Sequence, residues 1–92
     1  MILEHSESFE KSVKRIKDVI ALKRLKVLIE ALKAAHNLNE IPNVKPVVKN
    51  PNVYRIRTGN YRLFVLYKNF EITILLLEYV KKNEKIYDKY NE

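Results

Sequence analysis

Cysteine is absent from this 92-residue chain, which excludes a disulfide framework, a thiolate nucleophile and any zinc site built on cysteine. Its single glycine cannot form the glycine-rich loop that cradles phosphates in nucleotide-binding proteins. The two histidines, His5 and His36, are remote from each other, and neither has a second ligand at metal-binding spacing. We therefore expect neither a metal site nor any other cofactor.

Long apolar runs are also absent, since none approaches the roughly 18 residues that a membrane-spanning helix requires. The N-terminal segment, Met1–His5, is too short and too polar to act as a secretory signal. These absences predict a cytoplasmic protein that does not associate with a membrane. The hydrophobic content of 47% indicates a folded chain, and its length suits one domain over residues 1–92.

Acidic residues are missing from one stretch of the chain. Residues 41–70 contain six Lys and Arg side chains but no Asp or Glu. This stretch supplies +6 of the formal net charge of +7, so the flanking segments are nearly neutral. A localised positive field steers polyanions, and nucleic acid is therefore the expected kind of partner.

The one glycine lies in the middle of this basic stretch. Gly59 and the asparagine after it separate two runs of β-branched and aromatic residues within Tyr54–Tyr67. A Gly-Asn pair in this setting predicts a two-residue hairpin turn of type II′, which needs a positive φ at its first central residue. The turn sets the register of the two strands, so that Arg57 faces Arg62.

Three arginines share one face of this predicted hairpin. Because side chains alternate along a strand, Arg55, Arg57 and Arg62 lie on the same side. The opposite side carries the apolar residues Ile56, Leu63 and Val65. Like charges placed opposite one another destabilise a sheet, so this arrangement indicates that the arginines bind an anion. The alternative is that they are solvated and meet scattered carboxylates, as charged surface residues usually do.

The first forty residues show the spacing of two helices. Apolar residues recur at helical intervals, first at Phe9, Val13, Ile16 and Ile20 and then at Leu22, Leu25, Ile29 and Leu32. Ser6 and Asp18 are suitable N-caps, and the second helix is expected to end near Asn37 in a left-handed C-cap. Because no Gly or Pro separates the two, one long helix over residues 6–35 is the alternative. The stripe shifts phase near Asp18, which favours two helices.

Shorter apolar segments predict the strands of a sheet, at residues 2–3, 44–48, 54–58, 61–67 and 72–77. A tight turn at Lys68-Asn69 precedes the last strand, and Asn83 is expected to cap a closing helix over Glu84–Tyr90. The predicted fold is α+β. It has an N-terminal strand, an α-hairpin packed on an antiparallel sheet of about four strands, and a short C-terminal helix.

Two motifs of the hairpin carry a family resemblance. The segments Tyr54-Arg55-Ile56-Arg57 and Gly59-Asn60-Tyr61-Arg62-Leu63 are similar to the core of the RelE/ParE toxins of type II toxin–antitoxin pairs. The order of elements resembles that family over nearly the whole chain. For the RelE branch, the resemblance implies a metal-independent, ribosome-dependent endoribonuclease that cuts mRNA in the decoding site. It also implies three partners, namely a cognate acidic antitoxin, the ribosome and mRNA.

The resemblance assigns roles to residues of this chain by position. Arg62 resembles an arginine that stabilises the transition-state phosphate, Lys81 a general acid, and Tyr87 a tyrosine that orients or stacks the nucleotide. Arg55 and Arg57 resemble basic residues that are often lysines in RelE toxins, one of which is proposed there as the general base. RNA binding is expected of Lys45, Arg55, Lys82 and Lys85.

The proton acceptor and the branch of the family stay open at this point. Arginine is a poor general base because its guanidinium stays protonated in proteins, and Glu84 and Asp88 are nearby carboxylates that offer alternatives. A ParE-like module would inhibit DNA gyrase by protein contact and would need no special role for Arg57 or Lys81. A third possibility is a catalytically weak relic that only binds RNA or an antitoxin.

Overall fold

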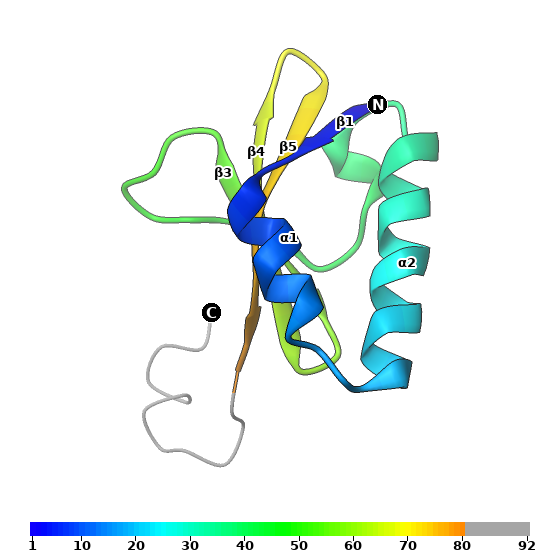
Figure 1. Cartoon of the computed structure of the whole chain (residues 1–92). Helices are drawn as coiled ribbons and strands as arrows, with labels where there is room; N and C mark the ends of the chain where they lie inside the picture. The colour runs from blue at the N-terminus through cyan, green and yellow to red at the C-terminus, as the bar shows by residue number, and fades with distance from the viewer. Residues whose placement is uncertain (81–92) are drawn as a thin grey trace.

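The computed structural model describes residues 1–80 and shows two α-helices packed on a five-stranded sheet (Figure 1). In chain order the elements are β1 (Ile2–His5), α1 (Glu7–Lys14), α2 (Val19–Ala34), the 3-10 helix η1 (Leu38–Glu40), β2 (Val44–Pro46), β3 (Val53–Thr58), β4 (Tyr61–Lys68) and β5 (Glu71–Tyr79). The strand order across the sheet is β1-β5-β4-β3-β2. The predicted α+β class is confirmed, while the closing helix predicted at Glu84–Tyr90 lies outside the described residues.

Strand pairing makes this sheet a mixed one. Strands β2 to β5 pair antiparallel with their neighbours, which agrees with the prediction of about four antiparallel strands. β1 adds a fifth strand that pairs parallel with β5, from Ile2↔Glu71 to His5↔Ile74. The sequence predicts this edge strand but not its pairing, because four residues carry no signal for a distant neighbour.

Gly59 occupies the turn of the β3–β4 hairpin. Its φ of 61° lies in the left-handed region that glycine adopts without steric cost. Arg57 pairs with Arg62 across the two strands, as the predicted turn requires. A Cβ atom on Gly59 would lie 2.7 Å from Arg24 Nη1. Because the end of the Arg24 side chain can move aside, the only glycine of the chain suits this position chiefly for its φ.

The turn between β4 and β5 lies one residue later than predicted. Asn69 and Phe70 are its central residues, with φ values of 53° and 61°, and Lys68 pairs with Glu71. Two successive positive φ values are typical of a type I′ turn. The prediction at Lys68-Asn69 is wrong because an aromatic residue rarely adopts a positive φ, so Phe70 gives no turn signal in the sequence.

Two separate helices form, with the predicted N-caps. Side-chain oxygens of Ser6 and Asp18 accept hydrogen bonds from backbone N–H groups in the first turns of α1 and α2. The predicted C-cap of the second helix is wrong, because α2 ends at Ala34 and Asn37 has an extended φ of −156°. Asn37 instead caps η1 by accepting a hydrogen bond from the N–H of Asn39 at 2.9 Å.

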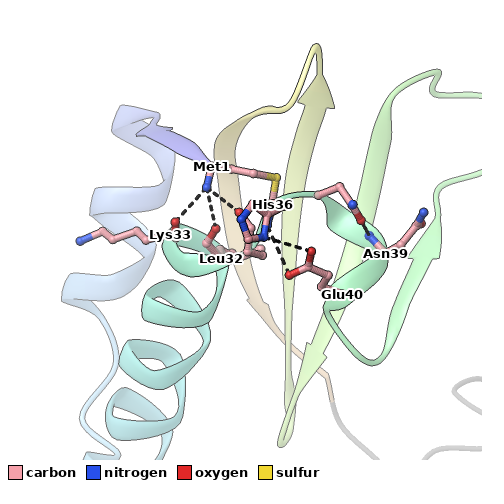
Figure 2. A network of polar contacts seen from close by, with 8 residues as sticks. Met1, Leu32, Lys33, His36, Asn39 and Glu40 are labelled. Atoms are coloured by element: carbon pink, nitrogen blue, oxygen red, sulfur yellow. Dashed lines mark hydrogen bonds and ion pairs between the residues drawn. The ribbon is translucent and has the colours of Figure 1, made fainter.

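The amino group of Met1 closes the C-terminal end of α2 (Figure 2). It donates hydrogen bonds to the carbonyl oxygens of Lys33 and Ala35, both at 2.8 Å, and a longer one to Leu32 at 3.4 Å. The last carbonyls of a helix lack partners within the helix, and a positive charge there suits the helix dipole. The start of β1 is therefore tied to α2, while the strand itself pairs with β5.

One hydrophobic core lies between the helices and one face of the sheet. Five of its side chains are the most completely buried, namely Leu32, Ile56, Leu63, Val65 and Ile72. Leu32 belongs to α2 and the others to β3, β4 and β5. Within residues 1–80, no helix packs on the opposite face of the sheet. In the same part of the chain, neither α-helix combines the length and the apolar character needed to cross a membrane.

Two serines fasten α1 to β5. Besides capping α1, the Ser6 hydroxyl donates a hydrogen bond to the carbonyl oxygen of Leu75 at 2.6 Å. The Ser12 hydroxyl oxygen accepts a hydrogen bond from the N–H of Leu77 at 3.3 Å. These bonds reach β5 where the register between β4 and β5 shifts, so the hydroxyls satisfy backbone groups beside a β-bulge.

Ser6→Ala is expected to lower the free energy of unfolding by about 1–2 kcal/mol, because it removes both the cap of α1 and the donor to Leu75. Urea denaturation followed by circular dichroism measures this change. Ser8→Ala is the control, since Ser8 is an exposed residue within α1 and alanine is the better helix former. Equal midpoints for the two variants would contradict the double role of Ser6.

Candidate functional site

The face of the sheet opposite the core carries two rows of cross-strand neighbours. The first row consists of Lys45, Arg55, Phe64 and Leu76. The second row, closer to the β3–β4 turn, consists of Arg57, Arg62 and Glu78. The residues between the rows, Ile56, Leu63 and Leu77, are buried in the core. Because side chains alternate along a strand, both rows lie on the open face.

Arg57 and Arg62 form the centre of this site. They are directly opposite each other on β3 and β4, where the Cα atoms of paired residues lie about 4.5–5.5 Å apart. Arg62 is half-buried, Arg57 is exposed, and Arg55 and Lys45 continue the positive charge toward β2. The predicted grouping of three arginines on one face is confirmed. Such a group suits phosphate, which a guanidinium can bind through two parallel hydrogen bonds.

Glu78 is a member of the site that sequence patterns do not reveal. It lies opposite Arg62 on β5, and its side chain is exposed. If the register set at the β4–β5 turn continued without a bulge, Arg62 would pair with Leu77. The Glu78 side chain would then point toward the core. The register shift at Phe64/Val65 moves the pairing by one residue and brings Glu78 to the open face.

The remaining predicted site residues follow β5 in the chain. Lys81, Lys82, Lys85 and Tyr87 lie outside the described residues, as do the alternative bases Glu84 and Asp88. β5 ends at Tyr79, and the N–H of Val80 donates to the carbonyl oxygen of Asn60 at 2.8 Å. The chain therefore leaves the sheet beside the β3–β4 turn, next to the second row. Among residues 1–80, no group of three His, Asp or Glu side chains could hold a metal ion.

A groove of about 510 Å³ lies between α2 and the β3–β4 turn. Its apolar lining includes Val27, Leu28, Ala31, Ile41 and Pro42. Lys23 and Arg24 of α2 also line it, so that it combines apolar surface with positive charge. Val27 is 69% exposed, which leaves this apolar surface of α2 open to solvent. Strand β3 borders the groove at Arg57, whose side chain lies on the open face of the sheet with the second row.

The chain is similar to several known toxins. Toxin RelE3 of Methanocaldococcus jannaschii is 36% identical over 59 residues, which are 63% of this chain and 66% of that protein, or slightly less than two thirds of its length. A chain of the RelB-RelE antitoxin-toxin complex from Methanococcus jannaschii has a TM-score of 0.74 and 26% identity, covering 95% of this chain and 98% of that one. The isolated E. coli RelE toxin has a TM-score of 0.65 at 15% identity, covering 96% and 92%, and shows a likeness of fold.

A family profile extends the similarity to most of the sequence. The profile of the ParE toxin of type II toxin-antitoxin system, parDE, matches residues 3–87. The matched range includes every strand of the sheet except the first residue of β1, and most of the segment that follows β5. Because the profile spans nearly the whole chain and the RelE structures share its fold, the chain belongs to the ParE toxin family of type II toxin–antitoxin systems.

Proposed function

We propose that this toxin is a metal-independent, ribosome-dependent endoribonuclease that cleaves mRNA and thereby inhibits translation. The observation that carries the proposal is the cross-strand pair Arg57 and Arg62, set beside Arg55 and Lys45 on a sheet face that no helix of residues 1–80 covers. The similarity to RelE toxins in sequence and fold supports the RelE branch of the family.

Cleavage of RNA needs few catalytic groups, because the 2′-hydroxyl of the RNA is itself the nucleophile. The protein must position the strand, stabilise the charge that grows on the phosphate and move protons. Arg62, in the middle of the second row, would hold the scissile phosphate, and Arg57 would share its charge from β3. Lys81 is the proposed acid for the leaving oxygen, and Tyr87 the side chain that stacks a base.

Other basic residues are proposed to bind the RNA backbone. Lys45 and Arg55 extend the positive face from the second row toward β2, and Lys82 and Lys85 add charge after β5. Contacts of this kind position a nucleic acid without reading its sequence. The choice of codon therefore depends on the ribosome and on the stacking contacts more than on these side chains.

The test of the proposal is cleavage of mRNA on translating ribosomes. Purified protein is added to a translation reaction and the new RNA ends are mapped by primer extension. Cuts are expected within the codon that occupies the decoding site, and none in mRNA without ribosomes. Normal translation together with impaired supercoiling by DNA gyrase would contradict the ribonuclease and favour inhibition of gyrase.

We also infer that a cognate acidic antitoxin docks in the groove between α2 and the β3–β4 turn. Solved relatives include antitoxin-toxin complexes. An acidic amphipathic helix would place its apolar face on Val27 and its carboxylates near Lys23 and Arg24.

Val27→Asp is expected to weaken antitoxin binding by about tenfold or more, because it places a carboxylate in the apolar part of the groove against an acidic partner. Isothermal titration with the cognate antitoxin measures the affinity. Val48→Asp is the matched control, since Val48 is 80% exposed and lies outside the groove. An equal loss of affinity in both variants would place the antitoxin elsewhere.

A further inference from the structure

Glu78 has a position that no other carboxylate of residues 1–80 shares. It lies opposite Arg62 and is exposed on the open face of the sheet. Glu71 pairs with Lys68 at the other end of β5, about 20 Å away at the usual rise of a strand. Glu4 belongs to the β1 edge, and the remaining carboxylates lie on the helices, their caps and η1, which pack on the opposite face.

The arginines of the site cannot fill one chemical role, that of the proton acceptor. An arginine guanidinium stays protonated in proteins, so neither Arg57 nor Arg62 can accept the proton of the 2′-hydroxyl. A carboxylate beside the reacting group can accept it. We propose that Glu78 is the general base of the cleavage reaction, a role that rests on the ribonuclease function proposed above.

The order of the second row suits this reaction. In an in-line displacement, the attacking and leaving oxygens lie on opposite sides of the phosphorus atom. A phosphate held by Arg62 would have Glu78 on the β5 side and Arg57 on the β3 side. Each neighbour is one strand spacing away, about 4.8 Å, so Glu78 lies next to the residue that would hold the phosphate.

The proposed step transfers one proton to Glu78. The 2′-hydroxyl proton passes to its carboxylate as the 2′-oxygen forms a bond to phosphorus. The bond between phosphorus and the 5′-oxygen then breaks with its electron pair on oxygen, which takes a proton from Lys81, the acid named above. The products are a 2′,3′-cyclic phosphate and a 5′-hydroxyl. Glu78 afterwards releases its proton to water, and Lys81 regains one from water.

A simpler role for Glu78 is to neutralise Arg62, and the two roles predict opposite results. If Glu78 is only a counter-charge, Glu78→Gln strengthens phosphate binding and leaves the cleavage rate unchanged or higher. If Glu78 is the base, the same variant binds ribosomes as well as the wild type but cleaves about 10²–10⁴-fold more slowly. The binding and cleavage measurements therefore separate the two roles.

The experiment measures single-turnover cleavage on mRNA-programmed ribosomes, with the toxin at saturating concentration and its ribosome binding measured separately. Glu71→Gln is the matched control, because Glu71 is the other exposed glutamate of β5. It is expected to cleave at the wild-type rate. Glu78→Asp retains a carboxylate on a shorter side chain and is expected to restore part of the activity lost in Glu78→Gln. Urea midpoints of all variants verify the fold.

Two outcomes would overturn the assignment, and they are distinguishable. A wild-type protein that cuts no mRNA on ribosomes overturns the ribonuclease function and the role of Glu78 with it. A wild-type protein that cuts, together with a Glu78→Gln variant of equal rate, overturns the role of Glu78 alone. Loss of cleavage in Glu84→Gln or Asp88→Asn under that second outcome would place the base after β5.

Discussion

Arg62→Ala is expected to reduce the single-turnover rate of mRNA cleavage on ribosomes by about 10²–10³-fold. Arg62 is the middle member of its row, with Arg57 on one side and Glu78 on the other. Its neighbour Leu63 is fully buried, which holds this part of β4 in place. The variant would remove the group proposed to face the growing charge of the phosphate. Time courses of RNA-end formation at saturating toxin measure the rate.

Two further variants separate charge from geometry. Arg62→Lys keeps the charge but loses the planar fork that binds phosphate through two hydrogen bonds, so an intermediate rate is expected. Arg15→Ala removes the same charge from an exposed residue at the end of α1 and is expected to cleave normally. An Arg62→Ala variant that cleaves as fast as Arg15→Ala would contradict the placement of the scissile phosphate on Arg62.

The β3–β4 hairpin and the face that its arginines share could be predicted from the sequence because the geometry of a hairpin is set locally. A two-residue turn at Gly59 allows one register, and the alternation of side chains then assigns a face to each residue of Tyr54–Tyr67. The structure has this register and buries Ile56 and Leu63 on the face opposite the arginines. The caps at the starts of the two helices were predictable for the same reason, since a cap bonds to residues two or three positions away.

The features that the sequence does not predict depend on contacts between distant segments. β1, at the start of the chain, pairs with β5, the last strand of the described residues. No local sequence pattern specifies a partner so far away in the sequence. The β-bulge opposite Phe64/Val65 lies among apolar residues that look alike, and the hydroxyls of Ser6 and Ser12 bond to β5 beside it. This bulge decides that Glu78 joins the site. A register counted from the turn alone would exclude it.

The residues of the proposed site also form two groups, those whose position the structure describes and those that still depend on the family resemblance. The structure brings together four of the basic residues predicted from the sequence, namely Lys45, Arg55, Arg57 and Arg62. Their roles in binding and cleavage stay predictions, which their charge and their shared position on the open face of the sheet support. Lys81, Lys82, Lys85 and Tyr87 stay predictions that depend on the family resemblance, because they follow the last described strand.

Leu32→Ala is expected to lower the free energy of unfolding by about 3 kcal/mol, within the 2–5 kcal/mol range for such changes in a core. Leu32 has no exposed surface and lies in α2, whose packing on the sheet it helps to form. The loss combines the transfer free energy of the missing side-chain atoms with the cavity that remains. Alanine favours helix, so the effect does not come from weaker helix propensity. Urea denaturation measures it.

Val27→Ala is the matched control, because Val27 belongs to the same helix but is 69% exposed. Its free energy of unfolding is expected to stay within about 0.5 kcal/mol of the wild type. A similar small loss in Leu32→Ala would contradict the packing of α2 on the sheet. A domain of this size is usually stable by about 5–14 kcal/mol, so Leu32→Ala should remain folded at 25 °C. Normal cleavage by this variant below its midpoint would then show that catalysis depends on the open face, whereas stability depends on the core beneath it.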